Sequence, residues 1–227
     1  SEIRTMAGIS YSDLAVRIMT PLIGPSITPD ALAQMVREAY VTFDHAAVTP
    51  LVQLGPQDWL LELFHGPTLA FKDVALQLVG RMFEHFLNRR GERVTILVAT
   101  SGDTGSAAIH AIKGRKSADI VVLHPKGRTS DIQRRQMTTV LEPNVHNIAI
   151  EGTFDDCQTL VKAMFNDAAF RSQQRLSAMN SINWARVMPQ IVYYFHAALS
   201  LNRADAPTGF SVPTGNFGDI YAGYAAA

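Results

Sequence analysis

Residues 94–105 read VTILVATSGDTG, and this stretch determines the fold class. Its first six residues are apolar or β-branched, as in a buried strand, and its two glycines allow a tight turn before a helix expected over residues 106–113. The same alternation continues with strands at 120–123 and 145–150 and a helix at 130–141. Repeated strand–helix units with apolar strands form parallel sheets covered on both faces, so the sequence predicts an α/β fold.

Other segments show helical spacing of their apolar residues. From Val74 the apolar positions recur at four-residue steps, which is typical of one face of a buried helix. A further helix follows Thr153, whose hydroxyl and Asp156 form a variant of the capping box. Its apolar face includes Cys157, which we expect to be a buried hydrophobic residue rather than a nucleophile. Helices are also predicted at 10–23, 29–40 and 182–201, and strands at 58–64 and 210–212.

Composition limits the classes of function. The chain has 227 residues, 47% of them hydrophobic, with 20 basic and 20 acidic side chains. This balance, without a long basic run, argues against a nucleic-acid or polybasic membrane surface and favours a small neutral or amphoteric ligand. A single cysteine excludes an internal disulfide, and no apolar run approaches the roughly 20 residues of a membrane span. With no secretory signal at its start, the chain is expected to be cytoplasmic.

Lys72 lies in HGPTLAFKDVALQ (residues 65–77), between Phe71 and Asp73 at the start of the helix that continues past Val74. Apolar neighbours desolvate an ammonium group and make its neutral, nucleophilic form more accessible. Such an amine forms Schiff bases with carbonyl substrates or pyridoxal phosphate. The alternative is a structural lysine that snorkels from the helix end or pairs with Asp73 or Glu62.

Two loops contain small residues between an apolar strand and a helix. In the first, Ser101, Gly102, Asp103 and Thr104 offer amides and hydroxyls that suit a carboxylate, although an ordinary capped turn has the same composition. The second loop suits a phosphate, and its candidate ligands are Gly215, Asn216, Phe217, Gly218 and Asp219. It matches neither the Walker loop nor the GxGxxG dinucleotide fingerprint.

Basic side chains offer further anion contacts. Lys126 and Arg128 follow a strand, and Arg186 lies at a helix start, where a guanidinium suits a phosphorylated substrate. Surface ion pairs are the commoner role of such residues. His65 is either a turn residue or part of the pocket, and the histidine spacing predicts no metal site.

Six segments together resemble the threonine synthase family, in that family's order: HGPTLAFKD (65–73), ATSGDTGSAA (99–108), HPKGRTSDIQRRQM (124–137), EGTFDDCQ (151–158), NSINWAR (180–186) and VPTGNFGD (212–219). The resemblance covers essentially the whole chain. It implies a fold type II pyridoxal-phosphate enzyme, similar to the tryptophan synthase β subunit, with open parallel sheets and helices on both faces. The implied reaction converts O-phospho-L-homoserine and water to L-threonine and phosphate.

The resemblance also implies roles for individual residues. Lys72 holds pyridoxal phosphate as a Schiff base and transfers protons, the loop from Gly215 to Asp219 binds the cofactor, and Ser101 to Thr104 face the amino-acid end of the substrate. Residues 1–90 and 201–227 are expected to belong to the large cofactor domain and 91–200 to a smaller substrate domain. The family continues beyond Ala227, so a fragment is expected, and its activity alone is left open.

Three alternatives remain at this stage. A threonine or serine dehydratase, or a sulfhydrylase, shares the lysine and both loops, but gives no reason for the basic segments PKGR and NWAR. A noncatalytic ligand-binding relative of threonine synthase is a different class of answer. The expected partner is a small molecule, without nucleic acid or membrane, and the expected state is a monomer or homodimer.

Overall fold

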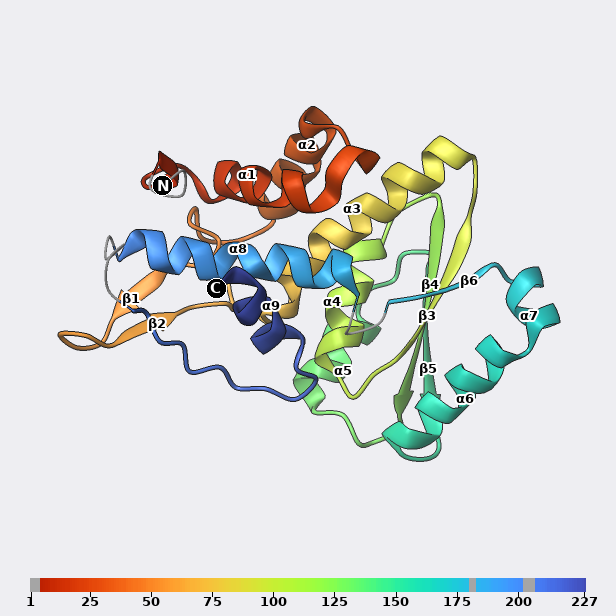
Figure 1. Cartoon of the computed structure of the whole chain (residues 1–227). Helices are drawn as coiled ribbons and strands as arrows, with labels where there is room; N and C mark the ends of the chain where they lie inside the picture. Colours follow the sequence, from red (N-terminus) through yellow and green to blue (C-terminus); the bar gives the residue numbers. More distant parts are fainter. Residues whose placement is uncertain (1–4, 180–182, 202–206) are drawn as a thin grey trace. The chain divides into compact units, whose positions relative to one another are not determined.

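A computed structural model describes residues 5–179, 183–201 and 207–227, which form two compact units (Figure 1). The first unit comprises Ser1–Leu78 with Ser181–Ala227, and the second comprises Val79–Asn180. The long helix after residue 182 therefore groups with the first unit, whereas the sequence analysis placed 91–200 in the second. The assignment of a cofactor role to one unit and a substrate role to the other remains a prediction.

The second unit is built on a parallel sheet of strands β3 (Val94–Ala99), β4 (Ala118–Pro125), β5 (Val145–Ile150) and β6 (Leu176–Ala178). Their spatial order is β5-β4-β3-β6. The register between β3 and β4 runs from Val94 opposite Ala118 to Ala99 opposite Leu123. The predicted α/β class with a parallel sheet is thus confirmed, and β6 is an additional edge strand.

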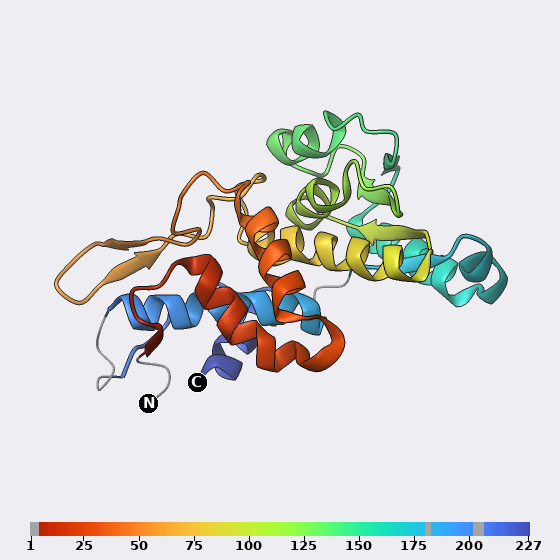
Figure 2. The same cartoon turned by 90° about the horizontal axis from the view of Figure 1, so that it is seen from above.

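Helices cover both faces of this sheet: α4 (Asp103–Ile112), α5 (Asp131–Thr138), α6 (Phe154–Asn166), α7 (Ala168–Gln173) and the later turns of α3 (Lys72–Arg90) (Figures 1 and 2). Leu97 and Leu123 pack with the buried Cys157 of α6, as its apolar stripe predicted. Side chains alternate along a strand, so the fully buried Ile96 and Ile120 point to the opposite face. Both faces therefore carry apolar core.

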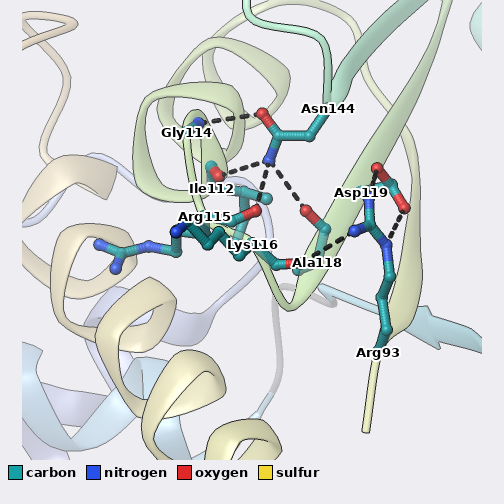
Figure 3. Close-up of polar contacts among 8 residues, drawn as sticks. All are labelled: Arg93, Ile112, Gly114, Arg115, Lys116, Ala118, Asp119 and Asn144. Carbon is teal, nitrogen blue, oxygen red and sulfur yellow. Dashed lines mark hydrogen bonds and ion pairs between the residues drawn. The ribbon is translucent and has the colours of Figure 1, made fainter.

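Asn144, the residue before β5, forms hydrogen bonds with the segment that connects α4 to β4 (Figure 3). Its amide nitrogen lies 2.8 Å from the carbonyl oxygen of Ala118 and 3.0 Å from that of Ile112, and its amide oxygen accepts from Gly114 N at 2.9 Å. Arg93 forms two hydrogen bonds with the carboxylate of Asp119 beside it. Side chains thus satisfy backbone groups that the turn leaves without ladder partners.

The first unit contains helices α1 (Tyr11–Ile23), α2 (Pro29–Tyr40), α8 (Trp184–Ser200) and α9 (Gly218–Ala226), the short helix η2 (Gly24–Ser26), the first turns of α3, and a hairpin of β1 (Leu51–Gln53) and β2 (Trp59–Leu61). Ser10 and Thr28 cap α1 and α2 by accepting from Asp13 N and Ala31 N. Both helices match the predicted bounds closely, because the capping residue and the spacing of apolar residues indicate the same helix start.

Several predicted bounds are wrong. Residues 210–212 form no strand, because strand assignment needs a ladder partner and no strand in the described residues pairs with them. The strand predicted at 58–64 is limited to the short β2. Helix α4 starts three residues earlier than expected, at Asp103, and α5 ends at Thr138. The predicted start at residue 182 lies outside the described residues.

Candidate active site

One cavity of about 140 Å³ lies within the first unit. Its walls include Lys72, Arg186 and the loop 213–219, three features that the sequence analysis singled out separately. Phe71 and Gln190 complete the lining. The fold therefore brings a lysine amine, an arginine and a loop at a helix start to one small space.

Lys72 is the first residue of α3, and the turn before it is built around the neighbouring carboxylate of Asp73. Thr68 donates to Asp73 from its backbone N at 2.7 Å and from its hydroxyl at 2.9 Å. A Cβ at Gly66 would lie 2.4 Å from Asp73 Cβ, so only glycine allows this close approach. Burial raises the pKa of Asp73, and the hydrogen bonds from Thr68 act against that shift. The Gly-Pro-Thr turn thus fixes where α3 begins and where Lys72 lies.

The surroundings of Lys72 bear on the alternative that it is a structural lysine paired with Asp73 or Glu62. Its Nζ lies 4.7 Å from the ring centroid of Phe71, a cation–π distance. The carboxylate of Asp73 is buried and accepts from Thr68, while Glu62 accepts from His65 Nε2 at 2.8 Å. Both carboxylates proposed as structural partners of the lysine thus accept hydrogen bonds from other residues.

The loop 213–219 leads into α9 without a side-chain cap at its N-terminus. Phe217 adopts a left-handed conformation with φ of 58°, which turns the chain into the helix. Gly215 lies in open space, with no atom within 4 Å of a Cβ placed on it. An uncapped helix start that faces a cavity suits an anion, because its amides and its dipole both favour negative charge.

Arg186 is a buried cation on the wall of this cavity. Its residue is 4% exposed, and Nε and Nη1 have no hydrogen-bond partner among the described residues. Burial lowers the pKa of Arg186 to about 10. Buried donors of a charged group without acceptors are costly, so these two nitrogens suit an anion. The first turn of α8, capped by Asn183, sets its position.

Sequence reasoning missed three residues around this cavity. Gln190 lies one turn after Arg186 and donates to its carbonyl oxygen at 2.6 Å. Tyr193 and Tyr194 reach Asp219 with their hydroxyls. The four-residue step from Arg186 to Gln190 was a usable signal, whereas nothing in the sequence linked the tyrosines to Asp219.

The loop after β3 belongs to the second unit, and several of its polar groups form hydrogen bonds with other residues of that unit. The hydroxyl of Thr100 accepts from Gly102 N at 3.0 Å and from Gly105 N at 2.9 Å. Gln133 donates to Asp103 at 2.6 Å and fills the space beside Gly102. One amide of the expected carboxylate cradle, that of Gly102, is therefore engaged, while Ser101 is exposed and Thr104 is half-buried.

Other candidates lie in surface settings. Lys126 is exposed and forms an ion pair with Glu151 at 2.5 Å, and Arg128 is exposed as well. His65 bridges Glu62 and Asp44, and the hydrogen bond with Glu62 is the main reason that its pKa is raised. In the part of the chain that the structure describes, no cluster of metal-ligating side chains is present and no helix is long and apolar enough to cross a membrane.

The family model described as pyridoxal-phosphate dependent enzyme matches residues 42–227. The chain is 58% identical to threonine synthase from Pseudomonas aeruginosa over 99% of its own length and 48% of that protein's. It is 49% identical to the Saccharomyces cerevisiae threonine synthase, over 95% of the chain and 45% of the relative. The chain thus spans about half the length of the curated relatives it matches.

Solved structures agree with the sequence comparisons. The chain superposes on threonine synthase with bound PLP (pyridoxal phosphate) from Brucella melitensis with a TM-score of 0.95 at 58% identity, covering 99% of this chain and 48% of that one. For threonine synthase from Escherichia coli the TM-score is 0.82 at 37% identity, with 99% and 51% covered. The predicted fold class is therefore confirmed, and the chain belongs to the pyridoxal-phosphate dependent enzyme family.

Proposed function

We propose that the chain binds pyridoxal phosphate through Lys72 and acts as a threonine synthase on O-phospho-L-homoserine. The observation that carries the proposal is one cavity lined by the Lys72 amine, the uncapped start of α9 and Arg186, whose Nε and Nη1 have no hydrogen-bond partner among the described residues. An aldehyde and two anions are the groups that such a cavity fits. The similarity to threonine synthases supports the same assignment.

The residues divide into distinct roles in this proposal. Lys72 attaches the cofactor aldehyde through its amine and then moves protons at the substrate carbons beside it. The loop from Gly215 to Gly218 holds the cofactor phosphate at the helix start. Bound pyridoxal phosphate supplies an electron sink for the carbanions formed during loss of the substrate phosphate. Arg186 takes the substrate phosphate by paired hydrogen bonds.

The second unit contributes the remaining contacts. Ser101 to Thr104 are proposed to face the amino-acid end of the substrate, and Lys126 to meet an anionic group after releasing Glu151. In this assignment the first unit is the cofactor domain and the second the substrate domain. A cytoplasmic location and a monomeric or homodimeric state are further parts of the proposal.

The decisive experiment compares Lys72→Ala with wild type and with Lys162→Ala, which removes an exposed lysine of α6. Titration with pyridoxal phosphate is followed by visible absorbance, and borohydride reduction is followed by peptide mass. Wild type and Lys162→Ala are expected to gain the absorbance and a reduced adduct on residues 72–81, while Lys72→Ala gains neither. An unchanged spectrum in Lys72→Ala contradicts the assignment of the lysine.

Product assays separate the alternatives within the fold. Phosphate release from O-phospho-L-homoserine with formation of threonine supports the proposal, and ammonia release from threonine or serine indicates a dehydratase instead. Cofactor loading without turnover of any of these substrates would point to the noncatalytic alternative.

Arg186 is tested by Arg186→Met, which keeps the volume and removes the charge. Because burial leaves two of the guanidinium nitrogens without a partner among the described residues, the stability of the cofactor-free protein should stay constant or rise. Loss of a charge-assisted hydrogen bond should raise the KM for the phosphorylated substrate by about tenfold or more. A loss of stability with unchanged KM would show that Arg186 is a structural residue.

A further inference from the structure

Two adjacent tyrosines of α8 converge on one carboxylate in the first turn of α9. Tyr193 donates a hydrogen bond to Oδ1 of Asp219. The hydroxyl of Tyr194 lies 2.9 Å from the same Oδ1 and 3.1 Å from the main-chain oxygen of Asp219. The two tyrosines are 1% and 5% exposed, and Asp219 is half-buried. Asp219 is thus tied to α8 through both its side chain and its backbone.

The environment keeps both hydroxyls as donors. Burial, followed by the charge of Asp219, raises the pKa of Tyr193 and of Tyr194. A protonated phenol donates and an ionised carboxylate only accepts, so two donors on one oxygen match the chemistry of the three groups. Hydrogen bonds to an ionised acceptor are the stronger kind, and burial makes their loss more costly.

Tyr194 also contacts the chain on both sides of the loop 213–218. Its ring packs edge to face on Phe210, with centroids 4.9 Å apart, just before the loop. After the loop, the ring lies so close to Gly223 that a Cβ there would be 2.9 Å from it. One tyrosine of α8 therefore contacts the chain both before and after this loop.

The loop itself lies on the surface of the unit. Residues 213–217 are exposed and lie outside any helix or strand. A loop that binds a ligand through its backbone must be held near its binding geometry, because ordering it on binding lowers affinity. We propose that Tyr193 and Tyr194 are positioning residues that fix the phosphate loop for its anion by anchoring Asp219.

This inference rests on the proposed function and assigns Asp219 a role different from direct cofactor contact. Its carboxylate serves as the anchor of the loop, and the backbone before it is left to meet the phosphate. The two tyrosines are far from the loop in sequence and touch neither the proposed phosphate site nor Lys72 in any described contact.

The test uses Tyr193→Phe, Tyr194→Phe and the double variant, with Tyr224→Phe as a matched control. Tyr224 lies on α9, the helix that begins next to Asp219, and it is 79% exposed. Amide hydrogen exchange of the cofactor-free protein is measured for a peptide covering 213–223, with a peptide of β4 as internal reference. The double variant is expected to exchange faster in 213–223 alone, and the control to match wild type.

Cofactor affinity is the second readout. Loss of both hydroxyls should raise the Kd for pyridoxal phosphate about tenfold, with smaller effects for the single variants. Unchanged exchange in 213–223, or unchanged Kd despite faster exchange, would overturn the anchoring role. If wild type itself fails to bind pyridoxal phosphate, the proposed function fails, and the exchange data still decide whether the tyrosines hold the loop.

Discussion

The two small-residue loops look alike in sequence, yet the molecule supports them in opposite ways. In the loop 100–105, the hydroxyl of Thr100 accepts two glycine amides, and Gln133 fills the space beside Gly102. In the loop 213–219, residues 213–217 are exposed, α9 starts without a side-chain cap, and Tyr194 contacts the chain before and after the exposed residues. The first loop satisfies two of its own donors internally, whereas the second presents an uncapped helix start to a cavity and suits a ligand through its backbone.

The largest effect is expected from Thr100→Val, which keeps the shape and removes the internal acceptor. Two buried amides would lose their partner, so the free energy of unfolding should fall by about 3 kcal/mol. Thr214→Val makes the same change in the exposed loop and should stay within about 0.5 kcal/mol of wild type. Denaturant unfolding measures both, and equal effects would refute the contrast between the loops.

Gly105→Ala is expected to cost about 2 kcal/mol through overpacking. The new Cβ would lie 2.5 Å from Cγ2 of Thr100 and 2.9 Å from Sδ of Met137. The backbone conformation at Gly105 is helical, so sterics rather than strain cause the loss. The unfolding midpoint reports the change, and Gly105→Ala combined with Met137→Ala should recover little, because the Thr100 contact remains.

The sequence was sufficient for elements whose local and tertiary signals agree. Helix α2 matches its predicted bounds because its cap and its apolar spacing coincide with a buried face, and strand β5 matches its predicted bounds with half-buried and exposed residues. The prediction failed at 210–212, where FSV has the composition of a strand but pairs with no strand in the described residues. Strand β6 was missed because three half-buried residues give no periodic signal.

The candidate site, too, was predictable only where residue type and local sequence carry the signal. Lys72, Arg186 and the loop before α9 were identified from residue type and neighbours, and the cavity brings them together. The pairing of Thr100 with two glycine amides and of Tyr194 with Asp219 arises only in the folded chain. Sequence therefore predicted which groups have the right chemistry, but not which of the two loops keeps its donors occupied.

A smaller effect is expected from pH, because two histidines should change the free energy of unfolding with pH in opposite directions. The Glu62 hydrogen bond raises the folded-state pKa of His65, so its stabilisation is full below the unfolded value near 6.5 and is lost as pH rises through the folded value. Burial lowers the pKa of His124, so folding favours its neutral form and stability falls as pH drops through 6.5.

These slopes are measured as the difference in unfolding free energy between wild type and His65→Gln or His124→Gln across pH 5.5 to 8.5. For His65 the difference should decline with rising pH by less than about 1 kcal/mol, because Asp44 is exposed and its ion pair is screened. For His124 it should increase with pH. Parallel slopes would contradict the different environments of the two rings.

The smallest effect on stability, and the sharpest contrast, is expected from Gly215→Ala. No atom lies within 4 Å of the added Cβ, and the residue does not adopt a positive φ, so unfolding should change by less than about 0.5 kcal/mol. The same methyl group would stand on the loop that is proposed to bring its backbone against a phosphate, where a side chain obstructs close approach. Cofactor affinity should therefore fall several-fold in a protein of unchanged stability, the reverse of Gly105→Ala. If Gly215→Ala binds pyridoxal phosphate as wild type does, the phosphate contacts lie elsewhere on the loop, and the open space beside Gly215 is only a feature of an exposed turn.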